Sequence, residues 1–327
     1  LAEVAYLYQP LRISVGADQI EVANRHQFTD ASAYEALAVL AREGDVLRSA
    51  PLAVAVAPGE SVSLTWPFAL PSEPGEYTLD VSFRLRADTS WAPAGHVVAS
   101  DQGVFTVAGE AAARTLPRPE LIAGIHNVGV RGPRFLALFS RLHGGLTSYR
   151  YGDNPDDGTE LLATIPQPNF WHAPTSNERG WQAPFADGQW LLASRYPGLR
   201  PDHPAPAAAL VGDAVEVRYA YTLPTAPASE CDVSYRVWVD GRVEVTVAVR
   251  PGEGLPDLPE FGMLFATGAD FHRLRWYGEG PHECYLDRRG SARLGVWQAE
   301  VAEQLTPYLR PQEAGSRTGV RWATVTD

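Results

Sequence analysis

The sequence contains no lysine, so all 27 of its basic side chains are arginines, set against 39 aspartates and glutamates for a net charge of −12. Proteins that bind nucleic acids usually present a basic face. The sequence has no arginine-rich run and an excess of acid, so no nucleic-acid partner is expected. We interpret the complete absence of lysine as a compositional bias rather than a functional feature.

Sulfur is scarce as well. Cys231 and Cys284 are far apart in the sequence, and neither belongs to a Cys-x-x-Cys pattern or stands beside a histidine pair. The eight histidines show no His-x-x-x-His spacing, so no metal site is predicted in this chain. Two reduced, buried thiols fit a cytoplasmic protein.

Long apolar runs are also missing, since no stretch reaches the 18 residues that a membrane-spanning helix needs, and no membrane partner is expected. The N-terminus lacks the basic and apolar blocks of a signal peptide. The chain begins with Leu1, and its single methionine is Met263. We therefore expect a processed or excised part of a longer protein.

What the sequence has in abundance is the alternation of apolar and polar residues that is typical of β-strands. Residues 77–85 alternate in this way, and residues 13–15 and 20–22 flank a probable turn. The clearest hairpin joins two alternating segments through Asp240-Gly241, because this dipeptide suits the tight turn between two strands. Helical periodicity is nearly absent, and residues 291–305 are the best candidate for a helix.

These patterns predict an all-β protein with two domains. Turn signals recur every 8–12 residues over 1–108, which is typical of an immunoglobulin-like β-sandwich. Residues 109–118 are small, polar and proline-bearing, and they predict a linker. Residues 119–327 predict a second, larger antiparallel β-sandwich.

Three ordered blocks carry a resemblance to a known family. The first block is spread over the predicted immunoglobulin-like domain, at residues 6–12, 24–30, 82–85 and 91–96. The second is Asn169-Phe-Trp-His-Ala-Pro-Thr-Ser-Asn-Glu-Arg-Gly180, and the third joins Arg275-Trp-Tyr-Gly-Glu-Gly-Pro-His-Glu-Cys-Tyr-Leu-Asp-Arg288 to residues 306–322. Together they resemble the C-terminal part of the large bacterial β-galactosidases of glycoside hydrolase family 2, namely the immunoglobulin-like domain 4 and the small-chain β-sandwich.

The resemblance implies a second domain of the supersandwich, galactose-mutarotase-like type. The family continues past the position of Asp327, so this sandwich is expected to be incomplete at its C-terminus, with an unpaired edge that favours a homo-oligomer. The implied reaction is hydrolysis of terminal β-D-galactose residues with retention, which needs two carboxyl groups. In the family these groups lie on a catalytic barrel, together with Mg and Na, and no such barrel is present here.

We therefore expect no catalytic residue, no metal and no cofactor in this chain, and no turnover by the chain alone. Its expected partners are the catalytic barrel and, through the whole enzyme, the β-galactoside. Glu279, Glu283 and Asp287 are close in sequence but are not expected to form a catalytic pair.

The resemblance does place one loop beside the active-site mouth of the family, and its residues here are His172, Asn177, Glu178, Gly180 and Trp181. Gly180 would act as the hinge of this loop. The loop differs from the family pattern in two ways. His172 stands where the family usually has arginine, and the segment 181–190 is short.

Nine tryptophans keep another function open, because sugars stack on exposed aromatic rings. Trp66 and Trp91 are predicted to lie in the core or at a domain contact, whereas Trp171 and Trp181 belong to the candidate loop. The alternatives to a β-galactosidase part are an autonomous carbohydrate-binding β-sandwich module and a purely structural module.

Overall fold

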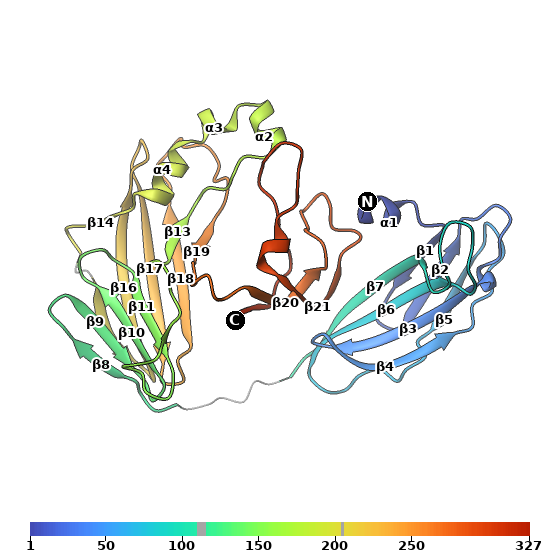
Figure 1. Ribbon diagram of the computed structural model, residues 1–327, viewed down its shortest axis with the longest axis horizontal. Helices are drawn as coiled ribbons and strands as arrows, with labels where there is room; N and C mark the ends of the chain where they lie inside the picture. Colours follow the sequence, from blue (N-terminus) through green and yellow to red (C-terminus); the bar gives the residue numbers. More distant parts are fainter. Residues whose placement is uncertain (110–115, 204–205) are drawn as a thin grey trace. The chain divides into compact units, whose positions relative to one another are not determined.

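The computed structural model describes residues 1–109, 116–203 and 206–327, and most of its regular structure is antiparallel strands (Figure 1). These residues form two compact units. The first contains residues 1–109, 272–306 and 314–327, and the second contains residues 116–271 and 307–313. The predicted linker, 109–118, lies mostly outside the described residues. The all-β prediction is confirmed.

The first unit contains a β-sandwich of two sheets. One sheet has the order β1-β2-β5 and the other β4-β3-β6-β7. A short helix, α1 (Ala2–Leu7), precedes them, and a 3₁₀ turn, η1 (Ala31–Ala33), precedes β3. The strands are β1 (Leu11–Val15), β2 (Gln19–Asn24), β3 (Tyr34–Arg42), β4 (Asp45–Leu52), β5 (Ser61–Thr65), β6 (Gly75–Leu85) and β7 (Val97–Val107).

Alternation explains the packing of this sandwich. In β6, Leu79, Val81 and Phe83 are fully buried, whereas the polar residues between them are more exposed. These side chains join Leu11 and Ile20 of the opposite sheet in one apolar core. The predicted hairpin at residues 13–22 is confirmed, since β1 and β2 pair antiparallel. Three strands facing four is the arrangement expected of an immunoglobulin-like sandwich.

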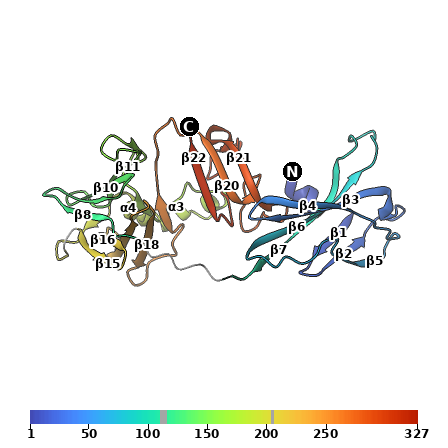
Figure 2. The ribbon, with the colours of Figure 1, turned by 90° about the horizontal axis from the view of Figure 1, so that it is seen from below.

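The first unit also contains a three-stranded sheet from the far end of the chain, in the order β21-β20-β22. Figure 2 shows these three strands side by side. A 3₁₀ turn, η2 (Val301–Gln304), follows β21. The strands are β20 (Arg273–Gly280), β21 (Arg293–Glu300) and β22 (Trp322–Thr326).

The second unit has two five-stranded sheets and a two-stranded ribbon. The first sheet has the order β12-β11-β10-β9-β8. The second has the order β14-β16-β17-β18, with β15 also pairing β16, and β13 pairs β19. The strands are β8 (Glu120–Ala123), β9 (Asn127–Arg131), β10 (Phe135–Ser140), β11 (Leu146–Tyr151), β12 (Thr159–Glu160), β13 (Gln167–Asn169), β14 (Gly198–Leu199), β15 (Ala207–Val211), β16 (Ala214–Leu223), β17 (Ser229–Trp238), β18 (Val243–Arg250) and β19 (Gly262–Leu264).

Aromatic side chains fill the core of the second unit. Phe135 and Phe139 of one sheet and Tyr219 and Tyr235 of the other belong to one buried cluster. The hairpin predicted around Asp240-Gly241 is confirmed: β17 and β18 pair antiparallel, and Gly241 has a φ of +91°. That angle is in the region that glycine adopts without strain.

Two sequence expectations were wrong. Residues 291–305 form no α-helix but strand β21 followed by η2, because pairing with β20 overrides a weak local helical pattern. Trp66 is buried as expected, whereas 65% of the surface of Trp91 is exposed, so of its two predicted places only the domain contact stays a prediction. Helices α2 (Ser176–Gly180), α3 (Ala183–Ala186) and α4 (Gln189–Arg195) were not foreseen.

The predicted thiols are buried and free: Cys231 and Cys284 form no disulfide. None of the helices among the described residues is long and apolar enough to cross a membrane. The domain boundaries 1–108 and 119–327 stay a prediction, since compact units follow packing and need not coincide with family domains.

Candidate functional site

The candidate loop lies in the second unit, directly after strand β13 (Figure 1). Phe170, the residue after β13, is fully buried, and its N–H donates to the buried Ser194 Oγ at 2.8 Å. Asn169 Nδ2 donates to the Trp171 carbonyl at 2.9 Å and to Glu260 Oε1 at 3.0 Å. The start of the loop is thus fixed to the core, while the residues after it reach the surface.

A capping box organises the next turn of chain. The Glu178 N–H donates to Thr175 Oγ1 at 3.3 Å, and the Thr175 N–H donates to Glu178 Oε2 at 2.6 Å. This reciprocal pair satisfies two backbone donors that a helix start otherwise leaves unpaired. Thr175 and Glu178 therefore cap the start of helix α2, which is a structural role that the resemblance did not suggest.

His172 is brought against the same glutamate. Its Nε2 lies 3.2 Å from Glu178 Oε1, and its Nδ1 lies 2.9 Å from the Ala173 carbonyl oxygen. Both ring nitrogens thus face acceptors, an arrangement in which the protonated imidazole can donate from both.

The remaining loop residues lie on the surface. Asn177 and Gly180 are exposed, and Trp181 is 60% exposed just after α2. A Cβ placed on Gly180 would meet nothing within 4 Å, and the φ of Gly180 is not positive. In this conformation the backbone does not require glycine there, so the hinge role of Gly180 stays a prediction.

The structure adds residues that sequence reasoning missed. The Ser176 N–H donates to Gln312 Oε1 at 2.8 Å, and Arg179 Nη2 donates to the Pro311 carbonyl oxygen at 2.6 Å. Residues 307–313, which are more than 130 positions further along the sequence, therefore hold α2 through two hydrogen bonds. Phe185 of α3 is 88% exposed, close in sequence to Trp181. No local pattern could have signalled these long-range contacts.

The loop encloses very little space. A hollow of about 10 Å³ lies between Trp171, His172, Glu178 and Asp187, which is room for about one water molecule. This part of the chain can therefore offer side chains to a ligand held elsewhere, but it does not form a sugar pocket by itself.

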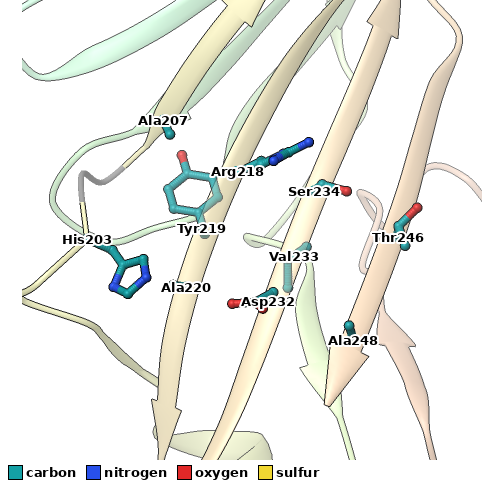
Figure 3. Close-up of a pocket in the computed structure, with 10 residues that line it drawn as sticks. All are labelled: His203, Ala207, Arg218, Tyr219, Ala220, Asp232, Val233, Ser234, Thr246 and Ala248. Atoms are coloured by element: carbon teal, nitrogen blue, oxygen red, sulfur yellow. The ribbon is translucent and has the colours of Figure 1, made fainter. Parts of the chain in front are cut away.

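A larger hollow of about 450 Å³ lies on the sheet that contains β16, β17 and β18. Figure 3 shows its polar lining, with Arg218 on β16, Asp232 and Ser234 on β17, and His203 at its side. Arg218 and Asp232, the arginine and the carboxylate in this lining, both have partners. Arg218 pairs with Glu216 at 2.5 Å, and Asp232 pairs with Arg250 at 2.8 Å.

The charged groups that line the hollow are thus balanced by neighbouring groups of opposite charge. Hydrogen bonds from Arg250 to Asp232 and Glu230 raise the pKa of Arg250 above its ordinary value. Asp232 is the single carboxylate among the lining residues, whereas glycoside hydrolysis with retention uses two carboxyl groups about 5 Å apart. The hollow has hydrogen-bonding groups that suit a sugar but lacks a hydrolytic pair.

Two carboxylates, Glu300 and Glu303, do line a third hollow of about 630 Å³ on the sheet formed by β20, β21 and β22. Glu300 Oε2 lies 2.7 Å from His272 Nδ1, and Oε1 lies 3.9 Å from Arg273 Nε. Glu300 is thus engaged by two basic side chains. Across residues 1–109, 116–203 and 206–327, no three side chains of His, Cys, Asp or Glu gather as a metal site would require.

Two models of known protein families match this chain. The family model described as "Beta galactosidase small chain" matches residues 131–327, and the model described as "Beta-galactosidase, domain 4" matches residues 20–106. The two matches account for most of the chain.

Similar proteins carry the same description. The chain is 35% identical over 335 residues to a β-galactosidase of Priestia megaterium, covering 100% of this chain and 31% of that protein. It is 32% identical over 328 residues to a β-galactosidase of Streptococcus thermophilus, with the same shares covered. It is 31% identical over 229 residues to a "Beta-galactosidase small subunit" of Latilactobacillus sakei, covering 65% of this chain and 70% of that subunit. The chain thus spans about a third of the length of the full β-galactosidases that it matches.

Proposed function

Because this chain belongs to the β-galactosidase family, in which it corresponds to domain 4 and the small chain, we propose that it is a non-catalytic part of such an enzyme. In this proposal the whole enzyme hydrolyses terminal non-reducing β-D-galactose residues, as in lactose. The chain braces the catalytic barrel and contributes the loop at residues 172–181 to the mouth of the active site.

The main support for the proposal is that the whole chain matches its relatives, whereas the match covers only part of each relative. The Priestia megaterium enzyme matches 100% of this chain, but only 31% of that enzyme is covered. Most of the enzyme therefore lies outside the matched region, and the two carboxyl groups that the reaction needs are assigned to that remainder. The ion-paired state of Asp232 and Glu300 supports this division of roles.

The partners follow from the same reasoning. The catalytic barrel is the first, whether on the same chain or, as the name of the Latilactobacillus sakei relative indicates for that protein, on another subunit. The β-galactoside meets this chain only through the assembled enzyme, which we propose to be a cytoplasmic homo-oligomer. Mg and Na would be held by the catalytic barrel.

A chromogenic β-galactoside tests the proposal. We expect the purified chain to release no chromophore above background, and we expect turnover when the rest of the enzyme is supplied as a second polypeptide. Turnover by the chain alone would overturn the proposal, and so would failure of the complementary polypeptide to be activated by a correctly folded chain.

The hollow on β16, β17 and β18 favours a second candidate, an autonomous carbohydrate-binding module. Its volume of about 450 Å³ falls in the range of ligand pockets, and Ser234 and Thr246 offer hydroxyl groups. Titration of the chain with galactose and lactose by calorimetry separates the two candidates. Binding that is lost in Ser234→Val would support the module, whereas the primary proposal predicts no heat of binding without the catalytic barrel.

A further inference from the structure

Residues 272–306 and 314–327, which we name the C-terminal arm, pack with residues 1–109 in one compact unit. The arm lies within the small-chain match, whereas the sandwich of residues 1–109 contains the domain 4 match. This packing therefore joins residues 1–109 to parts of the small-chain match that begin only at residue 272, and its contacts are specific.

Gln102 of β7 makes the most specific contact. Its Oε1 accepts the Leu294 N–H at 2.8 Å, and its Nε2 donates to the Leu294 carbonyl oxygen at 2.9 Å. A glutamine amide offers the same donor and acceptor as a peptide group, so Gln102 binds the arm as a neighbouring strand would. Both β7 and β21 are edge strands of their sheets, and such edges have unpaired backbone groups available.

Glu76 of β6 makes a second contact through charge. Its carboxylate accepts hydrogen bonds from Arg321 Nε at 2.9 Å and from Arg321 Nη2 at 2.6 Å, which makes a bidentate ion pair. The Tyr277 hydroxyl donates to the same carboxylate at 2.9 Å. Paired arginine–carboxylate contacts of this kind fix direction as well as distance.

Glu3 of α1 makes a third contact, with two backbone donors. Its Oε1 accepts the Gly290 N–H at 3.1 Å, and its Oε2 accepts the Ser291 N–H at 2.8 Å. A Cβ on Gly290 would lie 2.8 Å from Glu3 Oε1 and 2.8 Å from the Tyr6 ring. A larger residue at position 290 would require the Glu3 or Tyr6 side chain to shift.

Most of these contacts are polar. Arg293 donates to the Ser100 carbonyl oxygen at 2.8 Å and lies over the Tyr6 ring at 5.2 Å. Buried arm residues such as Trp276 and Leu294 are not members of the apolar core cluster of the sandwich. A polar, directional contact outside the apolar core of the sandwich resembles an interface between proteins more than the interior of one domain.

We propose that the C-terminal arm is a docking element that binds an immunoglobulin-like sandwich of this type without needing a covalent connection to it. In a β-galactosidase divided into two subunits, the same surfaces would form a subunit contact. The inference does not depend on the proposed function, because its readout is association and not hydrolysis.

Cutting the full-length protein tests the proposal. A protease recognition sequence replaces residues 110–115, the folded chain is cut, and denaturing electrophoresis confirms that two pieces exist. We expect the pieces to elute together in size-exclusion chromatography. Two folded pieces that separate at micromolar concentration would overturn the proposal.

Variants show whether the named contacts are responsible. We expect Gln102→Leu and Glu76→Gln each to raise the dissociation constant of the cut pieces roughly tenfold, the effect of one or two lost hydrogen bonds. Gln19→Leu and Glu73→Gln are the matched controls. The Gln19 side chain accepts a hydrogen bond from the exposed Ser63 hydroxyl of the neighbouring strand. The exposed Glu73 pairs with Arg42 within residues 1–109. Equal effects of contact and control variants would contradict the inference.

Hydrogen exchange on the uncut chain provides a readout that does not require the pieces to survive cutting. The Leu294 amide depends on Gln102 for its hydrogen bond. We expect this amide to exchange roughly tenfold faster in Gln102→Leu and to be unchanged in Gln19→Leu. Unchanged protection of Leu294 in Gln102→Leu would show that the contact does not hold the arm.

Discussion

At the scale of single residues, a few side chains link segments that are far apart in the sequence. Gln102 reaches Leu294 across 192 positions, and Glu76 reaches Arg321 across 245. Neither residue lies in a motif. Glu76 directly precedes the predicted strand at residues 77–85, and Gln102 lies on β7, which the sequence analysis did not predict. Alternation along one strand identifies its buried face but not the distant segment that covers the other face.

Gly44 tests how closely the arm approaches the sandwich. Gly44 has a φ of +88°, and a Cβ there would lie 2.3 Å from Val296 Cγ2. We expect Gly44→Ala to lower the free energy of unfolding by about 3 kcal/mol, from backbone strain and steric overlap together.

Gly59 is the matched control for this experiment. Its φ is +80°, but a Cβ there meets nothing within 4 Å. Gly59→Ala should therefore cost only the backbone strain, about 1 kcal/mol. Urea unfolding of both variants measures the difference, and equal costs would mean that β21 does not rest on the turn at Gly44.

Glu76 and Asp80 should respond to pH in opposite directions. Hydrogen bonds from Arg321 lower the pKa of Glu76 despite its partial burial, so its contribution to stability is present above pH 4.5, the ordinary glutamate value, and is lost as the pH falls through the folded-state pKa. Burial raises the pKa of Asp80, which the Gln102 hydrogen bond offsets only in part. The contribution of Asp80 is therefore present below pH 3.8 and is lost as the pH rises through its folded-state pKa.

Unfolding free energies measured from pH 3 to 7 check these signs. As the pH rises, the free energy of unfolding of the natural chain should increase relative to that of Glu76→Gln. Over the same range, it should decrease relative to that of Asp80→Asn. Parallel pH profiles for the two variants would contradict the assigned environments of these carboxylates.

At the scale of elements, the strands were predictable and the helices were not. Alternation at residues 77–85 and the turn at Asp240-Gly241 predict β6 and the β17–β18 hairpin because burial of one face dictates both. Helix α2 has only five residues, too few to show a periodic stripe. The Thr175–Glu178 capping box was visible in the sequence, but its meaning depends on the helix that follows it.

The candidate loop was predicted in part as well. The resemblance identified residues 172–181, and the structure brings His172 and Glu178 together. It leaves Asn177, Gly180 and Trp181 on the surface without a shared pocket. The support from Gln312 could not be predicted, since it depends on a contact across 136 positions.

Trp181 provides the test of the loop as part of the active-site mouth. In the assembled enzyme, we expect Trp181→Ala to raise KM about fivefold with little change in kcat, because a lost sugar-stacking contact of roughly 1 kcal/mol weakens binding before the chemical step. An equal KM for Trp181→Ala and the natural enzyme would contradict the proposal that this loop forms part of the active-site mouth.

At the scale of the whole molecule, family modules and compact units divide the chain differently. The small-chain match runs without interruption over residues 131–327, whereas residues 272–306 and 314–327 pack with the sandwich. A family module is defined by shared ancestry and a compact unit by packing. The C-terminal arm belongs to one module and is buried against the other, which no pattern in the sequence could indicate.

The most direct test of the account is to find which polypeptide bears the nucleophile. The assembled enzyme is treated with a 2-fluoro galactoside that traps the covalent intermediate of a retaining glycosidase, and the two polypeptides are weighed by mass spectrometry. We predict that the label is carried entirely by the catalytic polypeptide and that the 35.6 kDa chain keeps its unlabelled mass. A galactosyl adduct on any aspartate or glutamate of this chain would contradict the account.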